Sequence, residues 1–308
     1  MRKATIIICF ALSTALLPLS GSVAEPQNIT LRFAVNLKIT EGGYSASRIE
    51  ALMIHACEIF QEKSGYGCEV IITETEDQVI EMLVNGSANM AFIIQTTYAK
   101  ALHQGANLVP IANVEFHGTQ NDTICIYAID EKFQPGNPES LRNSKIGLNS
   151  FFDWIFLQQY ISDSGSSDKT RDYFDKVLKS HSDQSALMAL VFKKFDAVVM
   201  DGLSFSMASK TDKRFKNIRK LDCIGEFPTR PVVFNSKLPA DLIKRFTASL
   251  KKIHRDPDFK EFHFLFIATN ARFNNINAAA YKPMCDTYLH ALDTGWIRDY
   301  DKWEAEQK

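Results

Sequence analysis

The chain has 308 residues, of which 45% are hydrophobic, and its formal net charge is −1. This hydrophobic fraction is typical of a packed globule and excludes a largely disordered chain. The nearly neutral charge gives no indication of a nucleic-acid-binding surface. The length suits two lobes better than a single core.

Residues 1–24 have the pattern of a secretory signal peptide. Arg2 and Lys3 form the charged start, residues 6–19 are apolar, and Ser22-Val23-Ala24 is a small-residue cleavage site. The apolar stretch is shorter than the ~20 residues that span a bilayer, so we expect a cleaved signal and not a membrane anchor. Removing 24 of 308 residues leaves 284, and losing the two cations takes the net charge from −1 to −3. We expect the mature product to be soluble and to lie outside the cytoplasm.

The first half of the mature chain alternates between strand and helix patterns. Short apolar, β-branched stretches predict strands, and apolar residues three and four apart predict helices. In chain order, the expected elements are a strand at 31–35, a helix at 45–62, a strand at 68–73, a helix at 77–84, and strands at 90–94 and 109–114.

The second half repeats this alternation and then returns to the first. The expected elements are a strand at 123–129, a strand at 144–148, a helix at 151–160, a mixed segment at 173–178, a helix at 182–192, strands at 195–200, 223–227 and 232–234, and a helix at 240–253. The remainder, through Trp303, is expected to be helical or irregular.

This order predicts an α/β fold with two lobes, the second inserted into the first. The chain would cross between the lobes near 116–126 and 224–234, and the linking strands would act as hinges. We expect lobe 1 to comprise 25–118 and 228–308, and lobe 2 to comprise 119–227. No Ser/His/Asp order, metal-ligand spacing or glycine-rich phosphate loop is present, so we expect a binding protein without catalysis, metal or cofactor.

Five of the six cysteines lie after the predicted signal peptide. They contain no CxxC pair, which leaves zinc or thioredoxin-like chemistry without support, and an oxidising compartment permits disulfides. Cys57 and Cys68 are close in sequence and could pair. The partners of Cys125, Cys223 and Cys285 stay open, and the odd number leaves at least one thiol unpaired in a monomer.

Four segments resemble the PhnD-like periplasmic solute-binding proteins of phosphate, phosphite and phosphonate ABC transporters. They are 85–92 (NGSANMAF), 122–130, 180–197 (with SHSDQSAL and KKFDA) and 226–239, and the resemblance covers about 30–290. It implies a type II periplasmic-binding fold, with two α/β lobes joined by two hinge strands that close like a Venus flytrap on a small molecule. It also implies an ABC permease in the inner membrane as the partner.

The residues that hold the anion in this family are largely replaced here. The family places a Ser/Thr-rich helix start after a strand of the second lobe, where hydroxyl and backbone N–H groups cradle the anion. In this chain only Ser150 and Asn149 are donors at that place, beside Phe151, Phe152 and Asp153. A carboxylate there would repel a phosphate oxyanion. The ligand is therefore either a phosphonate-like anion held by fewer groups or a different small molecule.

Candidate ligand contacts follow the strands, because α/β proteins hold ligands at the carboxyl ends of their strands. Thr96, Thr97 and Tyr98 follow the strand at 90–94, and they either contact the ligand or cap and pack a helix. The family's tyrosine falls at Glu76 or Asp77 here, and Glu76 is either a ligand contact or part of a helix start.

In lobe 2, Ser150 either donates to the ligand or caps a helix. Phe151, with Phe152 and Trp154, either stacks on the ligand or belongs to the core. Asp201 ends a buried strand, where a carboxylate needs a partner or water, and the resemblance implies a ligand contact there.

His181 and Asp183 lie at the start of the helix expected at 182–192. The resemblance implies that one of them matches the family's histidine, while a surface His and a capping Asp are the alternative. The candidate ligand-binding residues are Tyr98, Thr97, Thr96, Ser150, Asn149, Phe151, His181, Asp183, Asp201 and Glu76.

Two carboxylates bear on the charge of the ligand. If Asp153 and Asp201 both face the cleft, the ligand would carry a positive or amino group, and nearby aromatic side chains would suit an amine or a small heterocycle. The alternative function is a ligand-binding accessory of a periplasmic sensing system, which a neighbouring kinase gene would favour over a neighbouring permease gene.

Overall fold

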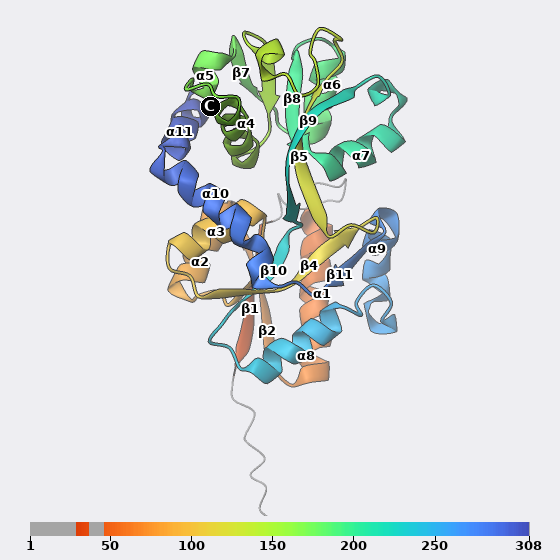
Figure 1. The fold of residues 1–308 in the computed structure, drawn as a ribbon. Coiled ribbons are helices and arrows are strands. Elements are labelled where there is room, and N and C mark those ends of the chain that lie inside the picture. The colour runs from red at the N-terminus through yellow and green to blue at the C-terminus, as the bar shows by residue number, and fades with distance from the viewer. Residues whose placement is uncertain (1–28, 37–45, 308) are drawn as a thin grey trace, which may run out of the picture.

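The computed structural model describes residues 29–36 and 46–307, and the predicted signal peptide lies outside the described residues. These residues form two lobes, each built around its own sheet (Figure 1). Within the described ranges, no helix is both long and apolar enough to cross a bilayer.

Lobe 1 has a six-stranded sheet with the order β11-β4-β10-β3-β1-β2. Its strands are β1 (Thr30–Asn36), β2 (Gly67–Thr73), β3 (Met90–Phe92), β4 (Leu108–Phe116), β10 (Pro231–Asn235) and β11 (Ala271–Asn274). The first three are parallel to one another, whereas β10 runs antiparallel to β3 and β4. The return strand β10 therefore lies inside the sheet, between two strands that precede it by more than a hundred residues.

Helices cover both faces of this sheet. They are α1 (Ala46–Ser64), α2 (Glu76–Asn85), α3 (Gln95–His103), α8 (Ala240–Leu250) and α9 (His263–Thr269). Alternate side chains of β1 point to opposite faces. Phe33 and Val35 pack with Phe60 of α1 and Leu242 of α8, whereas Ala34 packs against α2 and α3. Helices α2 and α3 thus share one face, and their N-termini follow the carboxyl ends of β2 and β3.

Lobe 2 has a five-stranded sheet with the order β7-β6-β8-β5-β9. Its strands are β5 (Asn121–Ala128), β6 (Lys145–Leu148), β7 (Lys176–Lys179), β8 (Ala197–Asp201) and β9 (Arg219–Pro228), and its helices are α4 (Phe151–Asp163), α5 (Thr170–Tyr173), α6 (Asp183–Val191) and α7 (Gly202–Thr211). Along β5, Ile124 and Ile126 pack against α4, whereas Cys125 and Tyr127 pack with residues of α6. This alternation is the two-residue period expected of a strand covered on both faces.

Several elements differ from the sequence-based expectations, and β11 is a strand in the part that was expected to be helical or irregular. The predicted helix at 240–253 ends at Leu250, and turns follow it. The predicted strand at 223–227 is the end of the longer strand β9, which pairs with β5 along its length. Residues 202–211, for which no element was expected, form α7, which Asp201 caps.

The chain crosses between the lobes at two adjacent places, after β4 and after β9 (Figure 1). The backbone N–H of Thr229 in the second crossing donates to the carbonyl of Gln120 in the first, at 2.9 Å. Asn113 of β4 donates from Nδ2 to the same carbonyl at 3.0 Å and to the Thr229 hydroxyl at 3.1 Å. The two linkers are therefore joined to each other and to the edge of lobe 1.

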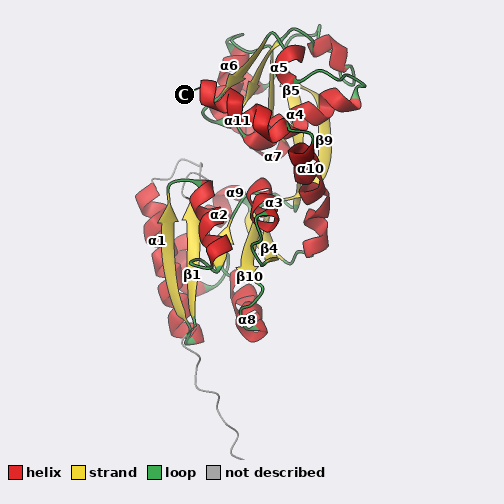
Figure 2. Ribbon diagram, turned by 90° about the vertical axis from the view of Figure 1, so that its left-hand side faces the viewer, coloured by secondary structure: helices red, strands yellow, loops and turns green. Residues whose placement is uncertain are grey.

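The C-terminal segment makes a third connection. Helix α10 (Lys282–Asp293) leaves lobe 1, and helix α11 (Trp296–Glu306) lies along lobe 2 beside α4 (Figures 1 and 2). Trp303 is buried in the core of lobe 2 next to Trp154, with ring centroids 5.2 Å apart. The expected assignment of all of 228–308 to lobe 1 therefore does not describe α11, because its apolar face is buried against the other lobe.

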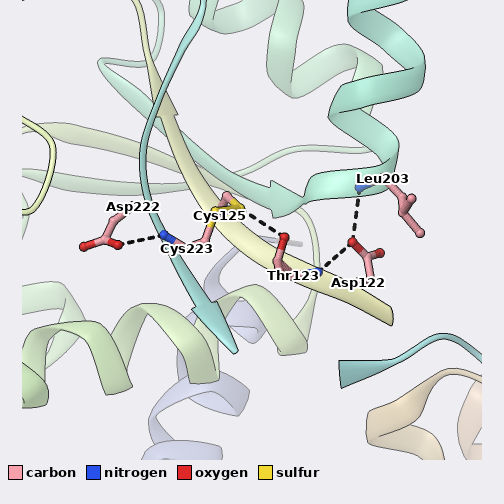
Figure 3. Close-up of a disulfide and its surroundings, with 6 residues drawn as sticks. All are labelled: Asp122, Thr123, Cys125, Leu203, Asp222 and Cys223. Atoms are coloured by element: carbon pink, nitrogen blue, oxygen red, sulfur yellow. Dashed lines mark hydrogen bonds between the residues drawn. A yellow bond between two sulfur atoms is a disulfide. The ribbon is translucent and has the colours of Figure 1, made fainter. Parts of the chain in front are cut away.

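Two disulfides form. Cys57 of α1 pairs with Cys68 of β2, which is the pairing that the sequence left open, and Cys125 of β5 pairs with Cys223 of β9. The second disulfide joins the two strands that lead to the crossings, next to Thr123 and Asp222 (Figure 3). Cys285 is the free cysteine among the described residues.

Candidate ligand site between the lobes

Helix N-termini from both lobes gather at the junction of the lobes. Helices α2 and α3 follow strands of lobe 1, and α4, α6 and α7 follow strands of lobe 2. Each such end exposes backbone N–H groups and carries the positive end of the helix dipole, so it favours a negative group. What already occupies these N–H groups decides which ligands the site can accept.

The lobe 1 wall is built by the first turns of α2 and α3. Thr75 caps α2, and Glu76 in its first turn accepts a hydrogen bond from the Thr97 hydroxyl of α3. Burial raises the pKa of Glu76, and the bond from Thr97 and the positive charge of Arg230 act against this shift. Thr97 is therefore held by a protein partner in this structure.

Thr96 and Tyr98 are both buried. The Tyr98 ring packs against Tyr281 with centroids 5.4 Å apart, inside the lobe 1 core. Burial raises the pKa of Tyr98 to about 12. Helix α3 differs from its neighbours, because Ile94 precedes it and no side chain caps its N-terminus.

In lobe 2, the start of α4 carries an internal carboxylate. Asp153 accepts hydrogen bonds at Oδ2 from the backbone N–H groups of Asn149 and Ser150, at 2.9 and 2.8 Å. The Ser150 hydroxyl in turn accepts from the Asp153 N–H at 3.2 Å, which completes a capping box. Asp153 is only 4% exposed, and burial followed by the charge of Asp183 raises its pKa to about 8. The carboxyl group therefore takes the backbone N–H groups of the two residues that precede α4.

The first turns of α6 and α7 lie next to the capping box of α4. The Asn149 side-chain amide donates to Asp183 Oδ1 at 3.0 Å. Asp201 caps α7 by accepting from the Ser204 N–H at 2.6 Å. Burial and the charge of Asp201 raise the pKa of Asp183 to about 6, against the hydrogen bonds from Ser204 and Asn149. Asn149, Asp183 and Asp201 are therefore brought together from three segments of lobe 2.

Asp122 belongs to the same cluster, although the sequence did not single it out. Its Oδ1 accepts from the N–H groups of Thr123 and Leu203 at 2.8 and 3.1 Å (Figure 3). Burial and the charge of Asp201 raise the pKa of Asp122 to about 7. The one sequence signal for it is a carboxylate at the start of a buried strand. A hollow of about 460 Å³, lined by Asp122, Leu203 and Glu226 among others, lies beside it.

Arg230, in the second crossing, was also missed. Its positive charge opposes the rise in the pKa of Glu76 in lobe 1 and of Asp183 in lobe 2. It therefore lies within electrostatic range of carboxylates from both lobes, which brings the two walls into one site. A single arginine in a loop gave no pattern that could have identified it.

Three remaining candidates lie away from the polar cluster or are covered. His181 is exposed. Phe151 packs against Tyr300 and Tyr288, with centroids 5.0 and 6.2 Å away. Trp154 is 1% exposed and packs in the core of lobe 2. The C-terminal helices, far along the chain, supply the aromatic rings that cover Phe151 and Trp154.

Two lobes joined by paired linkers, with helix N-termini facing the junction, define a protein of the type II periplasmic-binding class. Residues 43–281 match the family model described as "ABC transporter, phosphonate, periplasmic substrate-binding protein". The chain belongs to this family, which confirms the resemblance found in the sequence. A search of the curated proteins gave no match.

Solved structures give the same fold. XAC2383 from Xanthomonas citri bound to ATP has a TM-score of 0.66 at 11% identity, covering 86% of this chain and 98% of that one. PhnD1 from Prochlorococcus marinus with methylphosphonate has a TM-score of 0.63 at 13% identity, covering 84% and 96%. A binding protein component of an ABC phosphonate transporter from Pseudomonas aeruginosa has a TM-score of 0.61 at 12% identity, covering 91% and 100%. At these identities the likeness establishes the fold and not the ligand.

Proposed function

We propose that this protein is the periplasmic solute-binding component of an ABC importer and that it captures a small molecule between its two lobes. The observations that carry the proposal are the two lobes joined by paired linkers and the match of residues 43–281 to the periplasmic substrate-binding family. A small polar ligand at this junction would contact both lobes at once.

Capture requires no chemical step. A ligand that contacts both lobes stabilises the closed arrangement over the open one, and rotation about the two linkers brings the walls together. The closed form would then dock on the inner-membrane permease. Two disulfides and the signal-like N-terminus agree with a role outside the cytoplasm.

We further propose that the ligand carries a positive or amino group that faces lobe 2. Asp153 already occupies the N–H groups of Asn149 and Ser150 just before α4, and Asp122 and Asp201 occupy two at the start of α7. Two like charges 4 Å apart repel by about 4 kcal/mol at an effective dielectric constant of 20. A helix N-terminus contributes at most about 2 kcal/mol to binding an anion. Above pH 7 the carboxyl groups of Asp122 and Asp183, with pKa values of about 7 and about 6, are mostly ionised, so repulsion outweighs the helix dipole for a phosphonate placed against lobe 2.

The ligand class is tested with three matched probes: methylphosphonate, ethylamine and 2-aminoethylphosphonate. Thermal unfolding of the protein without residues 1–24 is followed with each. We expect the two probes with an amino group to raise the melting temperature at pH 8 and methylphosphonate to leave it unchanged. Stabilisation by methylphosphonate but not by ethylamine would overturn the cationic ligand while leaving solute binding intact.

The binding role has its own test. Protein purified from its host is examined by native mass spectrometry, and a retained small molecule released unchanged supports capture. Conversion of that molecule during incubation would show an enzyme and would contradict the proposal.

A further inference from the structure

The C-terminal segment with α10 and α11, which forms the third connection between the lobes, is attached at its start to the second crossing, the linker after β9. Tyr281, at the end of the short helix Ala278–Tyr281, is fully buried and donates from its hydroxyl to the Thr229 carbonyl at 2.7 Å. Its ring also packs on Tyr98 of α3. The start of α10 is therefore fixed both to lobe 1 and to one of the two linkers.

The middle of α10 contacts one helix from each lobe. The Tyr288 ring lies 6.1 Å from His103 of α3 and 6.2 Å from Phe151 of α4, measured between ring centroids. Tyr288 is buried. The first turns of α3 and α4 form part of the two walls of the candidate site. A rotation of the lobes that moves these helices relative to each other must change the packing around Tyr288.

The far end of the segment is fixed to lobe 2. Trp303 donates from Nε1 to the Val177 carbonyl of β7 at 2.9 Å. Asp299 and Glu306 of α11 pair with Lys169 and Arg171 at 2.9 and 2.7 Å. Exposed ion pairs contribute little, at most about 1 kcal/mol each, so the buried aromatic packing of α11 is the main attachment.

A rigid element thus spans the junction with both ends fixed. Helix α10 has 12 residues, which corresponds to about 18 Å of helix. Gly295, with φ of 80°, lies between α10 and α11, where its left-handed conformation permits the sharp turn. Two linkers alone allow a hinge motion, whereas a third attachment limits its range.

We propose that α10 and α11 form a strap that sets the angle between the lobes in the ligand-free protein, and that Tyr288 is the contact through which it acts. The idea rests on the proposed function, because the lobe angle matters only if the lobes close on a ligand. Tyr288 is a positioning residue, since it acts on the walls of the site through α3 and α4.

The test measures the angle without any ligand. In a Cys285→Ser background, spin labels are attached at Val84→Cys on α2 and Asp163→Cys at the end of α4, two exposed positions on different lobes. Electron spin resonance then gives the distance distribution between them. We expect Tyr288→Ala to shift or broaden this distribution, and Tyr288→Phe to keep it. Leu289→Ala, at the exposed neighbouring position, is the matched control and should also keep it.

An unchanged distribution for folded Tyr288→Ala would overturn the strap. If that variant does not fold, His103→Ala removes the lobe 1 side of the same contact at an exposed residue, and an unchanged distribution there would be equally decisive. Neither result depends on ligand binding, so failure of the strap is distinguishable from failure of the proposed function.

Discussion

The side-chain amide of Asn149 donates a 3.0 Å hydrogen bond to Asp183 and so joins the loop before α4 to the first turn of α6. Asn149 therefore has two roles, because its backbone N–H also donates to Asp153. One residue thus holds two of the carboxylates that give the candidate site its negative character. The predictions below follow from these carboxylates and from the way the lobes are held together.

The first prediction concerns Asn149→Ala. The hydrogen bond from Asn149 lowers the pKa of Asp183, so its removal should raise that pKa above the present value of about 6. Carbon-13 NMR titration of the aspartate carboxyl groups measures this shift. Asn217→Ala, at an exposed position, is the control. An Asp183 titration that stays in place in the Asn149→Ala variant would contradict the prediction.

The second prediction concerns stability against pH. Burial raises the pKa of Asp122 from 3.8 to about 7, so the folded state binds this proton more tightly than the unfolded state. The resulting stabilisation is complete below pH 4 and is lost as the pH rises through 7. We expect the free energy of unfolding to fall by about 1–3 kcal/mol between pH 5 and pH 8.5.

The matched variant for this prediction is Asp122→Asn. The amide oxygen can still accept from Thr123 and Leu203, and the amide N–H₂ imitates the protonated acid facing Asp201. Urea unfolding at both pH values should therefore show a smaller loss in the variant than in the parent. An equal loss in both proteins would assign the pH dependence to other groups.

The third prediction compares the two disulfides. Cys125 and Cys223 are 98 residues apart, whereas Cys57 and Cys68 are 11 apart. In the chain-entropy description a disulfide that closes a longer loop restricts the unfolded chain more, and typical contributions are about 2–4 kcal/mol. The double variant Cys125→Ala/Cys223→Ala should therefore lose more unfolding free energy than Cys57→Ala/Cys68→Ala in guanidinium titrations. The reverse order would show that local packing outweighs loop entropy here.

The fourth prediction uses two tryptophans that pack on each other. Trp154 Nε1 is buried without a hydrogen-bond partner, whereas Trp303 Nε1 donates to Val177. An unsatisfied buried donor costs about 1–3 kcal/mol. Trp154→Phe removes that cost together with some packing, so we expect a change in unfolding free energy within about 1 kcal/mol of the parent.

Trp303→Phe is the matched comparison. It removes a satisfied donor and leaves the Val177 carbonyl without its partner, so it should cost about 2 kcal/mol more than Trp154→Phe. Equal losses from the two substitutions, measured by chemical denaturation, would refute the difference assigned to the hydrogen bond.

Much of the fold could be predicted because its elements are specified locally. The alternation along β5 and the apolar spacing of α1 are patterns that repeat within ten residues or fewer. The capping box of Ser150 and Asp153 is also local, since both side chains lie in one turn of α4. The sequence placed these two residues at a helix start, but it did not show whether they face a ligand or cap the helix.

Other features depend on which strands become neighbours. Asp122 reaches the N–H of Leu203 across 81 residues only because β5 pairs with β8. Arg230 acts on carboxylates of both lobes only because the second crossing lies beside the first. These long-range interactions produce no periodic pattern in the sequence.

The sequence by itself determined the α/β class, the two-lobed order and the family, because backbone periodicity and local motifs carry that information. The tertiary structure alone decided that α11 belongs with lobe 2, that Cys125 pairs with Cys223, and that internal carboxylates occupy the helix N-termini of lobe 2. The physical reason is that burial, charge coupling and hydrogen bonding depend on distances in space, which chain order does not specify.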